Sequence, residues 1–163
     1  MSEAAPVLYM LCGKVAAGKS TLGQRLATPG SIVIAQDHWM SKLYKQELQS
    51  VADYARLIPR LRDAIGPHVA DLLRAGLCVV MDWPANTIAS RAWMRRIFES
   101  AGASHQLHFL DVPDEVCLAR LQVRNAEGRH EYTVSRAEFE ELTRYFEPPT
   151  PAEGFDIVIH REG

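Results

Sequence analysis

Residues 13–20 read Gly13-Lys14-Val15-Ala16-Ala17-Gly18-Lys19-Ser20 and match the pattern GxxxxGKS/T at every fixed position. The apolar run from Val7 to Leu11 precedes this stretch and predicts a buried strand, and residues 20–27 after it predict a helix. The pattern requires a strand before it and a helix after it. A chance match in a chain of this length has a probability on the order of one in a few hundred. Residues 13–20 therefore predict a phosphate-binding loop.

The chemistry of such a loop explains the spacing of its residues. Glycines let main-chain N–H groups converge on phosphate oxygens, and the following helix directs its positive end at the same anion. Lys19 can reach the β- and γ-phosphates of ATP, and the Ser20 hydroxyl can ligate Mg²⁺. The side chain of Lys14 occupies a variable position, and we assign it no role. We expect ATP to be held by Gly13, Lys14, Val15, Ala16, Ala17, Gly18, Lys19, Ser20 and Thr21.

Apolar runs alternate with helical patterns along the rest of the chain. We expect strands at residues 7–11, 32–35, 77–81, 106–110 and 155–160. We expect helices at residues 20–27, 47–74, 88–100, 113–124 and 135–146, the second broken at Gly66-Pro67 and the last opened by the capping pair Ser135 and Glu138. Residues 36–46 show no clean period. This alternation is typical of a parallel sheet covered on both faces, so we predict one three-layer α/β domain over residues 1–163.

Composition and charge exclude several classes of protein. The chain is 47% hydrophobic and 23% charged, close to the average of globular proteins, which argues against a disordered or collagen-like chain. Its net charge of −2 disfavours a nucleic-acid protein with a broad basic face. No apolar run reaches the roughly 20 residues that span a bilayer, and the first residues lack a signal-peptide pattern. We therefore expect a cytoplasmic protein with no membrane partner, in which Cys12, Cys78 and Cys117 are free thiols.

Carboxylates follow three of the predicted strands, at the edge where parallel sheets bind ligands. Asp37 is closest in sequence to the loop, and we interpret it as the base that orients an acceptor hydroxyl and takes its proton. A loop-capping role is the alternative for Asp37. Asp82 either holds a Mg²⁺-bound water or caps the turn at Trp83-Pro84. We expect a structural role for Asp111.

Two tryptophans and one arginine are candidates for binding the acceptor. Trp39 and Trp83 closely follow the two carboxylates, and aromatic walls can bury the apolar part of a substrate. Core packing is the alternative for both tryptophans. Arg91, on a predicted helix, could bind an anionic acceptor, and a solvated helix face is the alternative.

Arginines gather where the fourth predicted helix ends. Arg120 and Arg124 are one helical turn apart, and Arg129 lies in the polar segment after the helix. Guanidinium groups stabilise the charge that spreads over a phosphoryl group during transfer. A helix end and a polar loop rich in arginine are typical of a closing lid, which we place at about residues 120–134.

With the loop, Asp37 and the arginines in place, the chain resembles small P-loop kinases. The group includes polynucleotide kinases, zeta toxins and chloramphenicol phosphotransferases, together with AAA-type ATP-binding proteins of unknown substrate. The resemblance extends over nearly the whole chain. It is carried by LCGKVAAGKSTLGQRLA (11–27), IAQDHW (34–39), VVMDWPAN (79–86), FLDVPDEVCLARLQVRN (109–125) and YFEPPTPAEGFDIVIH (145–160).

The resemblance implies features that composition and spacing do not. The strands, numbered along the chain, would lie in the order 2-3-1-4-5. Asp37 would accept the proton of the acceptor, and Arg120, Arg124 and Arg129 would belong to the lid. Residues 147–149 would lie near the adenine.

The segment after Asp37 narrows the expected acceptor. Polynucleotide kinases and zeta toxins often carry an arginine shortly after this Asp, whereas this chain has Lys42. We therefore predict a Mg²⁺-dependent phosphotransferase that moves the γ-phosphate of ATP to a hydroxyl of a small molecule. The alternatives are a polynucleotide 5′-hydroxyl kinase and a non-catalytic ATP-binding switch.

Overall fold

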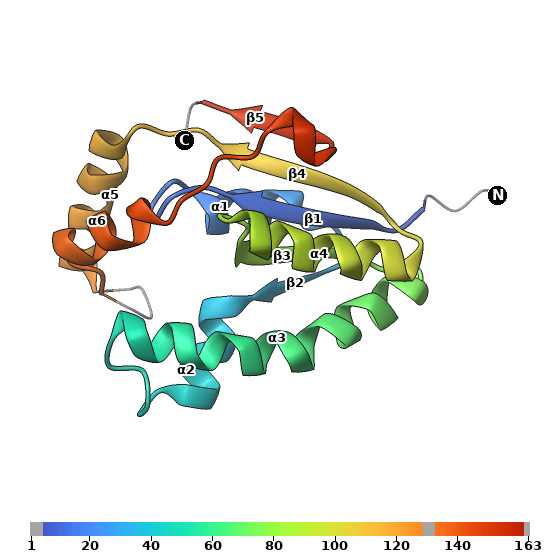
Figure 1. Cartoon of the computed structure of the whole chain (residues 1–163), viewed down its shortest axis with the longest axis horizontal. Helices are drawn as coiled ribbons and strands as arrows, with labels where there is room; N and C mark the ends of the chain where they lie inside the picture. The colour runs from blue at the N-terminus through green and yellow to red at the C-terminus, as the bar shows by residue number, and fades with distance from the viewer. Residues whose placement is uncertain (1–4, 129–132, 162–163) are drawn as a thin grey trace.

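In the computed structural model, which describes residues 5–128 and 133–161, five parallel strands form one sheet (Figure 1). Their order is β2–β3–β1–β4–β5, as the resemblance implied. The strands are β1 Val7–Cys12, β2 Ser31–Ala35, β3 Cys78–Pro84, β4 Ser104–Leu110 and β5 Ile157–His160. Because β1 lies in the middle, the glycine-rich loop that follows it emerges at the centre of the sheet's carboxyl edge.

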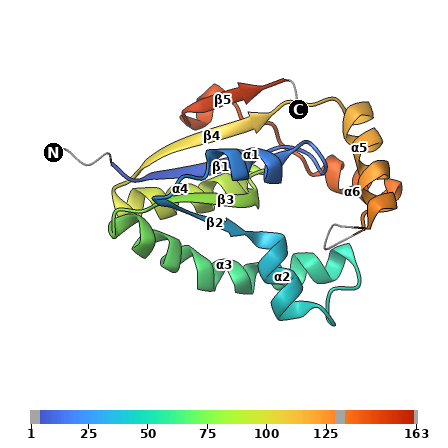
Figure 2. The ribbon, with the colours of Figure 1, turned by 180° about the vertical axis from the view of Figure 1, so that it is seen from behind.

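Helices cover both faces of the sheet, which confirms the three-layer α/β prediction. Seen from the two sides, α3 and α4 lie against one face and α1 against the other (Figures 1 and 2). Helices α5 and α6 lie beyond the carboxyl ends of the strands (Figure 1). The helices are α1 Lys19–Leu26, α2 Gln36–Tyr44, α3 Val51–Arg74, α4 Ile88–Ala101, α5 Asp114–Glu127 and α6 Arg136–Arg144, followed by a 3₁₀ turn at Pro151–Glu153.

The main core lies between the sheet and the layer formed by α3 and α4. Strands β1 and β3 are rich in apolar residues because helices cover both of their faces. Helix α3 buries apolar side chains at helical spacing. The fully or almost fully buried side chains include Leu8, Met10, Leu57, Leu61, Val69, Leu73, Val79, Met81 and Met94.

Helix α3 differs from the prediction because it runs unbroken through Gly66 and Pro67. A Cβ added to Gly66 would lie 3.3 Å from Nε1 of Trp93 on α4, so the glycine permits close helix packing rather than ending the helix. Helix α3 contains Pro59 and Pro67, and each removes one main-chain hydrogen bond; packing against α4 and the sheet offsets the loss.

Other boundaries also differ from those predicted. Residues 36–44 form α2, whose period was hard to detect because only Gln36 and Met40 are buried. Strand β3 continues to Pro84 and therefore contains Asp82, which was expected to follow the strand. The capping box of Ser135 and Glu138 is confirmed, and Ser135 immediately precedes α6.

The three cysteines are free thiols, as predicted. Cys12 and Cys117 are buried, whereas Cys78 is half-buried. Burial raises the pKa of Cys12 to about 11, which leaves it an unreactive thiol near neutral pH. In residues 5–128 and 133–161, no helix is both long enough and apolar enough to cross a membrane.

Candidate active site

A cavity of about 1010 Å³ lies beside the carboxyl ends of the strands. Its walls come from the loop after β1, from α2, from the first half of α3, from the start of α4 and from α5 and α6. Single-ligand pockets have volumes of about 300–1,000 Å³, so this cavity has room for a nucleotide and a small second ligand. The residues after β1 that line it are Val15, Ala16, Gly18, Lys19, Ser20 and Thr21.

Local geometry explains both fixed glycines of the loop. A Cβ on Gly13 would lie 3.2 Å from the Cβ of Ala17 and 3.3 Å from the Cβ of Leu110, so a side chain there would require both neighbours to shift. Gly18 has a φ of 106°, which L-residues rarely adopt, and α1 starts at the next residue. Ala16 has a φ of 64°, and it is the only non-glycine residue with a positive φ in the described ranges. The loop therefore wraps tightly around the start of α1, as phosphate binding requires.

An amide side chain just after the neighbouring strand β3 fixes the first residue of the loop. The main-chain N–H of Gly13 donates to Oδ1 of Asn86 at 2.9 Å, and Nδ2 of Asn86 donates to the Gly13 carbonyl at 2.8 Å. The Asn86 carbonyl in turn accepts from the N–H of Glu147 at 2.8 Å. Sequence reasoning missed Asn86, although its place just after β3 was a usable signal.

The Lys19 side chain folds back over its own loop. Its Nζ donates to the carbonyls of Gly13 and Lys14, the latter at 2.9 Å. Burial lowers the pKa of Lys19, and the negative charges of Asp82 and Asp37 oppose that shift. By contrast, Nζ of Lys14 pairs with Asp114 at 2.6 Å, so its side chain is turned away from the cavity.

Ser20 and Asp82 meet across the base of the cavity. Oγ of Ser20 donates to Oδ2 of Asp82 at 2.7 Å. A hydroxyl and a carboxylate are ligands that Mg²⁺ accepts, and Mg²⁺ normally takes its other ligands from phosphates and water. No group of three or more His, Cys, Asp or Glu side chains occurs in the described part of the chain that could bind a metal by itself. The pair therefore fits a Mg²⁺ ion that arrives with a nucleotide.

Asp37 lies in the first turn of α2 and lines the same cavity. Its negative charge opposes the lowering of the pKa of both Lys19 and Arg124, which line the cavity with it. The adjacent Gln36 is buried and donates through Nε2 to the hydroxyl oxygen of Tyr54 on α3. This hydrogen bond ties the start of α2, and with it Asp37, to α3.

Two of the three predicted lid arginines line the cavity, and the third, Arg129, lies outside the described residues. Nη1 of Arg120 donates to the Ala17 carbonyl of the loop at 3.2 Å. Burial lowers the pKa of Arg124, and the charge of Asp37 opposes that shift. Arg124 Nε is buried without a hydrogen-bond partner in the described structure. Helix α5 thus brings two cations to the cavity, and Arg120 is bonded to the loop.

The three other acceptor-binding candidates, Trp39, Trp83 and Arg91, are not among the residues that line the cavity, and for Trp83 the core-packing alternative is the one observed. Trp83 is 0% exposed and packs against Trp93, with ring centroids 5.1 Å apart, so it belongs to the core. Trp39 is on α2 and 39% exposed, so it belongs neither to the core nor to the cavity wall.

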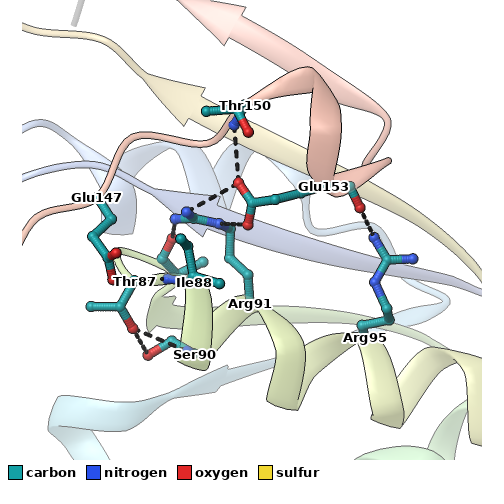
Figure 3. Close-up of polar contacts among 9 residues, drawn as sticks. Thr87, Ile88, Ser90, Arg91, Arg95, Glu147, Thr150 and Glu153 are labelled. Carbon is teal, nitrogen blue, oxygen red and sulfur yellow. Dashed lines mark hydrogen bonds and ion pairs between the residues drawn. The ribbon is translucent and has the colours of Figure 1, made fainter.

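Arg91 is also 0% exposed, and its charge is used inside the protein. Its Nε and Nη2 donate to the two carboxylate oxygens of Glu153 at 2.8 and 3.2 Å (Figure 3). Its Nη1 donates to the Ala85 carbonyl at 2.9 Å. Arg91 therefore fastens α4 to the segment before β5 and is not available to an acceptor.

Comparison with known proteins places the chain in a family. The family model described as an AAA domain matches residues 8–149. No curated protein matches the chain. A candidate kinase from Chloroflexus aurantiacus has a similar solved structure, with a TM-score of 0.75 and 21% identity over 98% of this chain and 86% of that one.

Two ligand-bound structures are also similar. The APS kinase of Mycobacterium tuberculosis, in complex with AMPPNP and APS, has a TM-score of 0.59 and 21% identity over 98% of this chain and 91% of that one. Kti12 of Chaetomium thermophilum, in complex with ADP-AlF3, has a TM-score of 0.68 and 18% identity over 95% of this chain and 88% of that one. The resemblance drawn from the sequence is confirmed: the chain belongs to the AAA domain family and has the fold of the small P-loop kinases.

Proposed function

We propose that the protein is a Mg²⁺-dependent phosphotransferase that moves the γ-phosphate of ATP to a hydroxyl of a small-molecule acceptor. The observation that carries this proposal is the position of Asp37 in one cavity with the loop, where its charge acts on Lys19. A carboxylate opposite a phosphate-binding loop is what transfer to an alcohol needs, because it can orient the hydroxyl and accept its proton. A pure nucleotide-binding module has no need of such a group.

In the proposed reaction the loop amides and Lys19 hold the β- and γ-phosphates. Asp37 accepts the hydroxyl proton as the acceptor oxygen bonds to the γ-phosphorus. The bond from that phosphorus to the β–γ bridging oxygen breaks, and ADP leaves. When bound, Mg²⁺ at Ser20 and Asp82 would neutralise charge on the β- and γ-phosphates.

Arg120 and Arg124 fit the role of stabilising the transferring group. Both side chains line the cavity at the end of α5, next to the loop. A guanidinium near the equatorial oxygens of the phosphoryl group offsets the charge that spreads there. We extend this role to Arg129 and to a lid at residues 120–134, and we place the reaction in the cytoplasm, where thiols stay reduced.

The test compares Asp37→Asn with Asp63→Asn, a matched change at an exposed position of α3. Each protein is incubated with Mg²⁺, ATP and a panel of hydroxylated metabolites and antibiotics, and acceptor-dependent ADP formation is measured. We expect Asp37→Asn to lower transfer by about 10²- to 10⁴-fold while ATP still binds. Asp63→Asn should behave as the wild type.

Two results would count against this function. Equal loss of ATP binding and transfer in Asp37→Asn would move Asp37 to the metal. Tight ATP binding with no transfer to any compound, together with a co-purifying protein, would favour the non-catalytic switch instead.

A further inference from the structure

Besides Arg120 and Arg124, an arginine of α3 lines the cavity. Arg62 lies in the middle of α3, and its Nη2 donates to Oγ of Ser90 in the first turn of α4 at 2.9 Å. The guanidinium carbon lies 5.1 Å from the ring centroid of Trp93 on α4, so the side chain is held between the two helices. Its position is therefore fixed before any ligand arrives.

The charge of Arg62 has no acidic partner in the described parts of the chain. Its Nε is buried without a hydrogen-bond partner there. Burial lowers the pKa of the guanidinium, which measures the cost of removing the charge from water. Buried cations are normally paired, as Arg91 is with Glu153. A half-buried, held and unpaired cation on a cavity wall indicates a site for an external anion.

The position of Arg62 separates it from the nucleotide end. Lys19 and Arg120 bond to carbonyls of the loop, whereas Arg62 contacts only α3 and α4 residues among its recorded partners. The start of α4 does not itself offer a free anion site, because the N–H of Ile88 donates to Oε1 of Glu147 at 3.2 Å. An anion in this part of the cavity would therefore meet the guanidinium.

Helix α3 gives the approximate span between Asp37 and Arg62. Tyr54, Ile58 and Arg62 follow one another at four-residue spacing and all line the cavity. Tyr54 is bonded to Gln36, next to Asp37, and it lies about 12 Å along the helix axis from Arg62. Between these two residues the wall is apolar, because Ile58 faces the cavity.

We propose that the acceptor is an anionic alcohol, whose carboxylate, sulfate or phosphate group binds Arg62 while its hydroxyl lies at Asp37. This inference rests on the proposed function and specifies its substrate class. Arg62 takes the part that the sequence had suggested for Arg91. A planar guanidinium can hold two oxygens of such a group at once, which also orients the hydroxyl.

The experiment first measures binding, with the nucleotide site filled by Mg²⁺ and AMPPNP. Melting temperatures are recorded with matched neutral and anionic alcohols: glucose and gluconate, glycerol and glycerate, and glycerol and glycerol 3-phosphate. Potassium chloride at equal ionic strength corrects for general salt effects. The proteins are the wild type, Arg62→Met, Arg62→Lys and Arg60→Met, a matched change at an exposed position of the same helix.

We expect at least one anionic compound to stabilise the wild type and Arg60→Met more than its neutral counterpart does. Arg62→Met should weaken that binding by about 10- to 100-fold, as expected for a lost charge-assisted contact, and Arg62→Lys should retain part of it. If the wild type phosphorylates one of these compounds, the Arg62 variants should raise the KM for that acceptor by the same factor by which they weaken its binding, and they should change kcat much less.

Three results would overturn the inference. One is equal stabilisation by neutral and anionic compounds, and another is unchanged binding in a folded Arg62→Met or Arg62→Lys protein. The third is the absence of any stabilisation by the anionic set while AMPPNP binds normally. Failure of the proposed function is seen separately, as selective anion binding without phosphoryl transfer in the wild type.

Discussion

The two ends of the cavity are built in different ways. The phosphate end comes mainly from one stretch, residues 13–21, and its main-chain N–H groups provide most of the chemistry. The proposed acceptor end is assembled from side chains on two helices, α3 and α4, among them Tyr54, Arg62 and Ser90. A loop that binds through its main chain depends on its glycines and its lysine. A site built from side chains can instead be altered by substituting one residue at a time.

This difference indicates which part of the cavity determines the specificity for the acceptor. The loop can bind any nucleotide triphosphate tail, because N–H groups recognise phosphate and not the molecule attached to it. The acceptor end contains the polar groups that could distinguish one alcohol from another. Mutations at the phosphate end should therefore abolish activity on every acceptor, and mutations at the acceptor end should change which acceptor is used.

The largest expected effect is at the phosphate end. Lys19→Ala should lower transfer by about 10³-fold, because the charge that meets the β- and γ-phosphates is lost. The melting temperature should stay near that of the wild type, since within residues 5–128 and 133–161 the hydrogen bonds of Lys19 Nζ go to carbonyls of its own loop. Lys45→Ala, at an exposed position, is the control. A melting temperature many degrees below that of the wild type would mean that the Lys19 side chain also stabilises the fold.

The same contrast explains what the sequence could predict. The loop, the five strands and the position of Asp37 after the second strand could be predicted from the sequence, because each depends on contiguous residues with a known period or spacing. Arg91 was misjudged because its partner, Glu153, is 62 residues away. Asn86 and Arg62 were missed for the same reason, since their importance comes from contacts with Gly13 and Ser90. Burial and pairing of a single side chain are tertiary properties that local patterns do not contain.

A second prediction concerns the ion pair that holds α4 beside the acceptor end. Glu153→Ala should lower the free energy of unfolding by about 3 kcal/mol, because it leaves the fully buried charge of Arg91 unpaired. Glu99→Ala removes a similar ion pair, to Arg95, at an exposed position and should cost about 0.5 kcal/mol or less. Urea unfolding of both variants measures the difference. Equal effects would show that the Arg91 pair is no more important than a surface pair.

A third prediction tests Asn86, which follows β3 and holds the first residue of the loop. Asn86→Ala removes both hydrogen bonds to Gly13, so the loop should lose part of its fixed shape. We expect ATP to bind about tenfold more weakly to Asn86→Ala than to the wild type, as measured by calorimetry. Gln24→Ala, an exposed amide on α1, is the control. Unchanged ATP affinity in a folded Asn86→Ala protein would mean that the loop holds its shape without help.

The smallest expected effect is a dependence on pH at the ion pair between Arg91 of α4 and Glu153. Burial alone would raise the pKa of Glu153, but the hydrogen bonds from Arg91 and the Thr150 N–H outweigh it and hold the pKa below its usual value. A lowered folded-state pKa means that this carboxylate adds stability above its unfolded pKa, about 4.3, and loses that contribution as the pH falls through the folded value.

Urea unfolding of the wild type and Glu153→Gln from pH 7 downward measures this contribution. The stability difference between the two proteins should be largest near neutral pH and shrink below about pH 4, where the wild-type carboxylate becomes protonated and resembles the amide. Asn86→Ala should instead differ from the wild type by the same amount at every pH in this range, because neither the amide nor the Gly13 main chain titrates there. A constant difference for Glu153→Gln would show that its carboxylate is not stabilised by Arg91.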